Sequence, residues 1–132
     1  MPNDPTTVYL ESEAASIPRL KLVRLVYAGA IDSLKSALVK LQARDRAGFV
    51  RAVNKAQDLI AELHLSIDHE NGGDVARDLE RLYEWTQRTL TPSCLKGDPQ
   101  GIEHAIQVLT KLQEAWDSIR DENVEAPLPT PE

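Results

Sequence analysis

Apolar residues recur at spacings of three and four along four segments of this chain, which is the period of one face of an α-helix. The segments cover about residues 17–42, 45–68, 75–89 and 98–119. Their stripes are, in chain order, Leu20, Val23, Tyr27, Ala30, Leu34, Ala37 and Leu41; Phe49, Val53, Ala56, Ile60, Leu63 and Ile67; Val75, Leu79, Leu82 and Trp85; and Ile102, Ala105, Leu109, Leu112, Trp116 and Ile119. Because such faces must be buried against one another, the sequence predicts an all-α fold.

Two of the stripes are wider than a narrow contact between two helices requires. Leu22, Leu25 and Val26 widen the first stripe near its beginning. Ala52 and Leu59 extend the second stripe, which then covers roughly 140° of the helix surface. This width suits either a helix in the middle of a bundle or a helix that borders a groove.

Capping residues and helix breakers separate the four segments. Asp45 is a candidate N-cap of the second helix, and residues 71–73 (Asn-Gly-Gly) are expected to end that helix, because Asn and Gly accept the left-handed conformation of a C-terminal cap. Pro92 is expected to stop the third helix, and Asp98 followed by Pro99 is typical of a cap and a first-turn proline. Since short connections favour antiparallel neighbours, we predict an antiparallel up-down four-helix bundle over residues 16–120.

The two ends of the chain differ in composition from the bundle. Residues 1–15 are mostly polar with two prolines, and they are predicted to form a flexible N-terminal segment. Residues 121–132 combine four acidic residues with three prolines. Such a composition buries too little apolar surface to order itself, so this stretch is predicted to be a disordered tail.

Charge and cysteine content exclude several classes of function. The formal net charge of −6 and the pI near 5.1 argue against a general nucleic-acid binder and against adsorption to anionic lipid. No run approaches the 18 or so consecutive apolar residues of a membrane span, so no membrane insertion is expected. Cys94 is the single cysteine, so the chain offers neither an intramolecular disulfide nor a cysteine-based zinc site. The expected compartment is the cytosol.

No group of residues predicts catalysis, a cofactor or a metal site. His64 and His69 are five residues apart, and on one continuous helix they would point about 140° away from each other rather than toward a shared metal ion. Cys94 has no histidine close to it in sequence that could act as its base. The chain is therefore not expected to be an enzyme.

Three blocks of sequence carry a resemblance to a known family. The first is residues 22–31, Leu-Val-Arg-Leu-Val-Tyr-Ala-Gly-Ala-Ile, and the last is residues 109–116, Leu-Thr-Lys-Leu-Gln-Glu-Ala-Trp. The middle block comprises Lys55, Ala56, Gln57, Leu59, Ile60, Glu62, Leu63, Ser66, Asp68, Glu70, Gly72, Gly73, Leu79, Leu82 and Tyr83. In this order, and with the double glycine, the blocks resemble the FliS family of bacterial flagellin export chaperones over about residues 15–119.

The resemblance implies a cytosolic chaperone that binds the C-terminal helical segment of flagellin, prevents its premature polymerisation and delivers it to the flagellar type III export apparatus. An apolar groove between bundle helices would hold such a segment by the helix-in-groove mode. The alternative is a helical-bundle interaction or regulatory protein of the same fold with a different partner. Components of the export gate and a second copy of the chain, as a homodimer, are further partners that stay open.

The resemblance also implies which residues would contact or support the partner. The N-terminal segment would correspond to the family's cap over the groove, with Tyr9 at the position of the family's tyrosine. The partner-binding candidates are Tyr9, Gln57, Ile60, Leu63, Ser66, Leu79 and Tyr83. For each apolar candidate, core packing is an equally good interpretation of the sequence.

Overall fold

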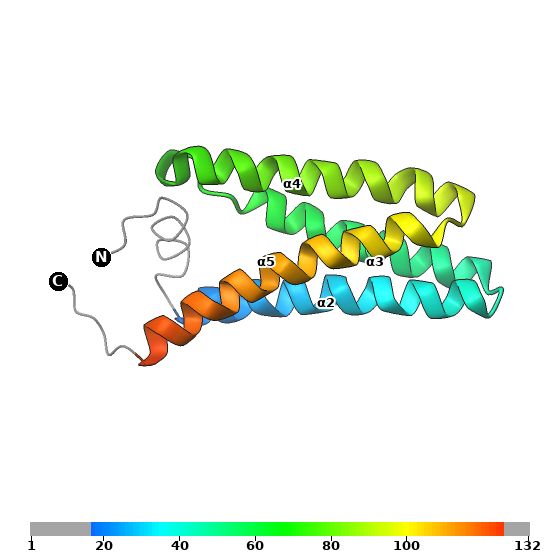
Figure 1. Cartoon of the computed structure of the whole chain (residues 1–132), viewed down its shortest axis with the longest axis horizontal. Coiled ribbons are helices and arrows are strands. Elements are labelled where there is room, and N and C mark those ends of the chain that lie inside the picture. Colours follow the sequence, from blue (N-terminus) through cyan, green and yellow to red (C-terminus); the bar gives the residue numbers. More distant parts are fainter. Residues whose placement is uncertain (1–16, 126–132) are drawn as a thin grey trace.

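The computed structural model describes the backbone of residues 17–125 and the side chains of residues 21–118. Tyr9, the predicted N-terminal segment and residues 126–132 of the predicted tail lie outside the described residues. Four helices make up the described part: α2 (Ile17–Gln42), α3 (Arg46–Leu65), α4 (His69–Lys96) and α5 (Pro99–Glu125). They run alternately in opposite directions (Figure 1), so the predicted all-α antiparallel up-down bundle is confirmed. Among the described residues, no helix is both long enough and apolar enough to span a membrane.

Each helix packs against two neighbours, in the order α2, α3, α4, α5 and back to α2. The contact between α2 and α3 is the most extensive. All four helices contribute to one core, whose largest fully buried side chains are Tyr27, Phe49, Leu34, Ile60, Leu90, Ile102, Leu109, Val53 and Thr86. The predicted apolar stripes of α2, α3 and α5 supply most of this core.

Two helix starts follow the predicted capping chemistry. Asp45 caps α3, because its Oδ1 accepts a hydrogen bond from the backbone N–H of Gly48 at 2.9 Å. Pro99 is the first residue of α5, and Oδ1 of Asp98 accepts a hydrogen bond from the N–H of Gln100 at 3.0 Å. Gly97 ends α4 in the left-handed conformation, with φ of 67°.

The break between α3 and α4 lies earlier than the sequence predicts. Helix α3 ends at Leu65, and Asp68 begins α4 as its N-cap by accepting a hydrogen bond from the N–H of Asn71. This cap starts a new helical turn before the glycines are reached, so residues 71–73 do not end the preceding helix. Gly73 instead forms a kink inside α4, with φ of 55° and ψ of −128°, a backbone conformation that favours glycine.

Pro92 does not stop α4, contrary to the prediction. The helix continues to Lys96, and Pro92 itself is exposed. A helical proline leaves the carbonyl one turn before it without its usual partner, whereas the last carbonyls of any helix need partners from elsewhere. Nη2 of Arg46 donates to the carbonyl oxygens of Cys94 and Leu95 at 3.2 and 2.7 Å, and these bonds from α3 secure the end of α4.

The inward face of α4 is also rotated from the predicted one. Leu82 and Trp85 are only half-buried, whereas Tyr83 and Thr86 are buried in the core. The buried positions of α4 follow the helical period and are Gly72, Val75, Ala76, Leu79, Tyr83, Thr86, Leu90 and Ser93.

Candidate partner-binding surface

A groove lies between the beginning of α2 and the end of α3, which are neighbours because the two helices are antiparallel (Figure 1). It has a volume of about 250 Å³. We call it the α2–α3 groove, and its lining residues are Leu22, Val23, Val26, Glu62, Leu63 and Ser66. Four of the six are aliphatic, so the groove presents a largely apolar wall with a carboxylate and a hydroxyl at its border.

Large apolar side chains are exposed at this end of the bundle. Leu22 is 61% exposed, Leu25 is 69% exposed and Leu65, at the last turn of α3, is 85% exposed. A single exposed leucine is unremarkable on a protein surface, but an exposed leucine in the wall of an apolar groove is typical of a binding surface. Leu22 is such a residue, whereas Leu25 lines a separate pocket between α2 and α5. The beginning of α2 and the end of α3 therefore offer an apolar partner a surface to bind.

Of the sequence-predicted candidates that the structure describes, two line this groove. Leu63 contributes to its wall, and the Ser66 hydroxyl donates a hydrogen bond to the Leu63 carbonyl at 2.9 Å. Ile60, Leu79 and Tyr83 are buried in the core, and Ile60 has no exposed surface at all. These three side chains support the surface from within the bundle.

Gln57 lies in a different place from Leu63 and Ser66. It lines a second groove, between α3 and α4, together with Arg46, Val50, Asn54, Thr91, Cys94 and Leu95. Its Nε2 donates to Oγ1 of Thr91 at 3.0 Å, and its backbone carbonyl accepts from Nε2 of Gln87 at 2.9 Å. Gln57 thus joins α3 to α4, away from the α2–α3 groove.

A buried pair of tyrosines links the helices behind this surface. The hydroxyl groups of Tyr27 in α2 and Tyr83 in α4 are hydrogen-bonded to each other. The ring of Tyr27 also lies against Trp116 of α5, with centroids 6.4 Å apart. Burial raises the pKa of Tyr27 to about 12, although its hydrogen bonds with Tyr83 and Trp116 oppose the shift.

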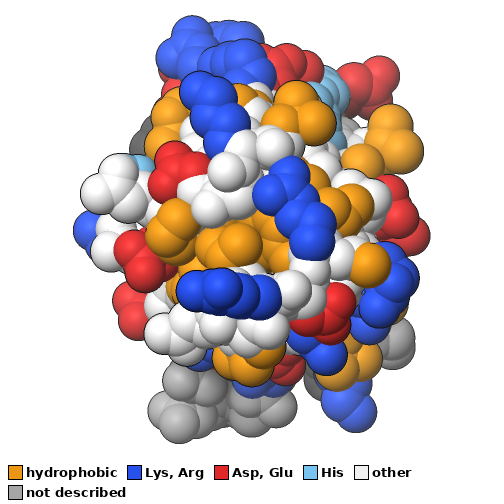
Figure 2. All heavy atoms as spheres, turned by 90° about the vertical axis from the view of Figure 1, so that its right-hand side faces the viewer, with side chains coloured by type: hydrophobic (Ala, Val, Ile, Leu, Met, Phe, Trp, Pro, Cys, Tyr) orange, Lys and Arg blue, Asp and Glu red, His pale blue; other side chains and the backbone are white. Residues whose placement is uncertain are grey.

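The opposite end of the bundle carries a second apolar area. Figure 2 faces this end and shows hydrophobic side chains in its middle, with Lys and Arg side chains around them. Val39 in α2 and Leu95 in α4 are 64% and 75% exposed. A pocket here is lined by Leu38, Val39, Leu41, Gln42, Gly97, Pro99 and Glu103, and no described candidate is among its lining residues.

Sequence reasoning missed the contribution of α2 to the α2–α3 groove. Leu22, Val23 and Val26 line it, but none of them is among the predicted candidates. The signal that could have found them is the widened apolar stripe at the beginning of the first helix, where Leu22 and Leu25 lie outside the face that meets the core.

Comparison with known proteins gives a consistent result. The protein-family model described as "Flagellar protein FliS" matches residues 1–123 of this chain. The flagellar secretion chaperone FliS of Salmonella typhimurium is 32% identical over 113 residues, which cover 85% of this chain and 84% of that protein. The protein of the same name from Vibrio cholerae is 30% identical over 115 residues, covering 87% of this chain and 85% of that protein. FliSB of Pseudomonas aeruginosa is 24% identical over 112 residues, covering 85% and 89%. This chain therefore belongs to the FliS family, whose curated members are flagellar secretion chaperones.

Proposed function

We propose that this chain is a cytosolic export chaperone that binds the C-terminal helical segment of flagellin. In this role it prevents premature polymerisation and delivers flagellin to the flagellar type III export apparatus. Its membership of a family of flagellar secretion chaperones supports a flagellar export substrate as its protein partner and a role other than catalysis. The observation that carries the proposal on the structural side is the apolar α2–α3 groove with the exposed Leu22 beside Leu63.

A chaperone of an assembling helical segment must cover the surface through which that segment associates. Such a segment has an apolar face that would otherwise pair with other flagellin molecules, so the chaperone has to cover that face. Ordering a flexible segment costs free energy, and an interface well above about 1,000 Å² is needed to offset that cost. One groove of about 250 Å³ holds only a few side chains, so the segment must extend beyond it over the neighbouring helices.

The first test is calorimetry with the full chain and C-terminal peptides of the flagellins encoded in the same genome. We expect saturable binding with a dissociation constant in the micromolar range or below. If the folded bundle binds none of these peptides at micromolar concentration but binds another flagellar export substrate, the alternative of a different partner replaces the proposal.

The structure provides a matched pair of variants for locating the binding surface. Leu22→Asp and Val39→Asp both alter side chains of α2 that are about equally exposed, at 61% and 64%, but at opposite ends of the bundle. We expect Leu22→Asp to weaken peptide binding at least about tenfold, because it places a charge in an apolar contact, and Val39→Asp to leave binding unchanged. Normal binding by a folded Leu22→Asp variant would exclude the α2–α3 groove. Ile60→Asp is unsuitable, because a charge at this fully buried position would disrupt the fold itself.

A further inference from the structure

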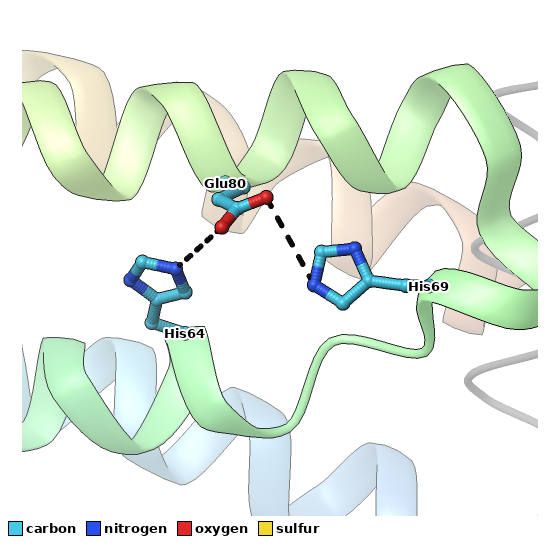
Figure 3. Close-up of polar contacts among 3 residues, drawn as sticks. All are labelled: His64, His69 and Glu80. Atoms are coloured by element: carbon cyan, nitrogen blue, oxygen red, sulfur yellow. Dashed lines mark hydrogen bonds and ion pairs between the residues drawn. The ribbon is translucent and has the colours of Figure 1, made fainter.

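The corner between α3 and α4 brings two histidines to one carboxylate. His64 lies in the last turn of α3, and His69 is the first residue of α4. Figure 3 shows both imidazole rings turned toward Glu80, with Nε2 of His64 3.4 Å from Oε2 and Nε2 of His69 4.0 Å from Oε1. On one continuous helix the two histidines would point away from each other. Because α3 ends at Leu65, His64 and His69 lie on different helices, and both can face Glu80.

A second carboxylate completes the cluster. Glu84 lies one helical turn after Glu80 on α4, and the donor atoms of His64, Glu80 and Glu84 all lie within 4.8 Å of one another. In the part of the chain that the structure describes, no Lys or Arg forms an ion pair with either glutamate, since the nearby Arg77 and Arg81 pair with Asp74 and Asp78. The two carboxylates therefore face imidazoles rather than permanent cations.

We propose that this corner binds a divalent transition-metal ion of the Zn²⁺ class, with His64, Glu80 and Glu84 as ligands and His69 as the fourth. Imidazole nitrogens and carboxylate oxygens are ligands that Zn²⁺ accepts in four-coordinate sites. Bonds of about 2.0–2.2 Å place tetrahedral ligands about 3.4 Å apart, so the donor atoms of His64, Glu80 and Glu84, which lie within 4.8 Å of one another, must approach by roughly 1 Å. Their side chains are only partly buried, at 29% exposed for His64 and 36% for Glu80, and rotation about their own bonds supplies this movement.

Such a site would tie the end of α3 to α4 across the short connection between them. The ring of His64 also lies beside that of Tyr83 on α4, with centroids 6.2 Å apart. The ion would therefore add to an existing contact between the last turn of α3 and α4. None of the four proposed ligands lines the α2–α3 groove, so metal binding here does not require the proposed partner.

The experiment titrates Zn²⁺ into the untagged full chain by calorimetry, with thermal unfolding as a second measurement. We expect one Zn²⁺ per chain and a rise in the unfolding temperature with Zn²⁺ concentration, since an ion that binds the folded state stabilises it. His64→Ala and Glu80→Gln should each weaken binding at least about tenfold. His104→Ala is the matched control, because His104 is an exposed histidine on α5, and it should leave binding unchanged.

Three results would overturn the proposal. The first is the absence of saturable binding at millimolar Zn²⁺. The second is unchanged binding in His64→Ala and Glu80→Gln variants whose circular dichroism shows an intact helical fold. The third is a loss of binding in His104→Ala, which would assign the ion to α5.

Discussion

The hydroxyl groups of Tyr27 and Tyr83 meet inside the bundle, where they are shielded from water. Burial raises the pKa of Tyr27 from 10 to about 12, so the folded chain keeps this phenol protonated at a pH where the unfolded chain releases its proton. The raised pKa therefore contributes stability that is complete below pH 10 and is lost as the pH rises toward 12. The loss amounts to about 3 kcal/mol at most, since one pKa unit corresponds to about 1.4 kcal/mol.

Urea unfolding of the wild type and of Tyr27→Phe, at pH 8 and at several values between 10 and 12, measures this contribution. Lysines also titrate there, so the informative quantity is the difference between the two proteins. We expect the free energy of unfolding of the wild type to fall more steeply with pH than that of the variant. Parallel pH profiles would show that Tyr27 does not titrate differently in the two states.

Thr86 shows why the inward face of α4 was difficult to predict. Its side chain is fully buried, yet a threonine between Trp85 and Gln87 gives no apolar signal in the sequence. The hydroxyl is satisfied within its own helix, because Oγ1 donates to the carbonyl of Leu82 at 2.7 Å. Large apolar residues favoured Leu82 and Trp85 as the core positions, whereas the helix turns its Tyr83 and Thr86 side inward.

At the level of the elements, α4 and α5 approach each other closely where Gly101 faces Ser93. A Cβ at Gly101 would lie 1.7 Å from Oγ of Ser93 and 2.9 Å from its Cβ, so it cannot be added without moving a helix or a side chain. Alanine is the better helix former by about 1 kcal/mol, but we expect Gly101→Ala to destabilise the bundle by about 1–3 kcal/mol because of this overlap. Urea unfolding at neutral pH measures the change.

Combining Gly101→Ala with Ser93→Gly tests whether the overlap with the Ser93 side chain causes the destabilisation. If the overlap is the cause, Ser93→Gly combined with Gly101→Ala should be more stable than the sum of the two single changes predicts. Strict additivity, or a Gly101→Ala variant at least as stable as the wild type, would contradict a close approach of the two helices at this point.

The existence of the four described helices could be predicted from the sequence, but two of their boundaries could not. The period of three and four identified all four helices, and Asp45 and Asp98 marked two starts correctly, because caps act through local hydrogen bonds. The corner at Asp68 and the continuation through Pro92 depend on which of several local signals prevails. Arg46, which is distant in sequence, donates hydrogen bonds to the last turn of α4, and no residue near Pro92 in the sequence indicates this contact.

At the level of the whole molecule, α2 and α5 close the ring of helices. Trp116 is 4% exposed and packs on Tyr27, whereas the neighbouring Asp117 pairs with Nε of Arg24 at 2.6 Å in a partly exposed position. We expect Trp116→Ala to lower the free energy of unfolding by about 3–5 kcal/mol and Asp117→Asn by less than about 1 kcal/mol. Equal effects in thermal or urea unfolding would mean that the Arg24–Asp117 ion pair contributes as much as the packing of Trp116 and would contradict this expectation.

The α2–α3 groove could be anticipated only in part, for a reason that belongs to the assembled bundle. Leu63 and Ser66 were identified because they lie in the block that resembles the family, but Leu22 and Val26 are some forty residues away in sequence. A wide apolar stripe does not indicate which of its side chains a neighbouring helix will cover. Ile60 and Leu22 are both apolar, yet packing buries the first completely and leaves the second 61% exposed.

The contact between α2 and α5 also has a consequence for synthesis. Of the four described helices, α2 leaves the ribosome first and α5 last, so one wall of α2 has no partner until α5 has been made. Since small domains fold as units, the bundle cannot close before α5 is made, and until then Tyr27 lacks the cover that Trp116 provides. This member of a family of flagellar secretion chaperones therefore has its own stage of exposed apolar surface at each round of translation.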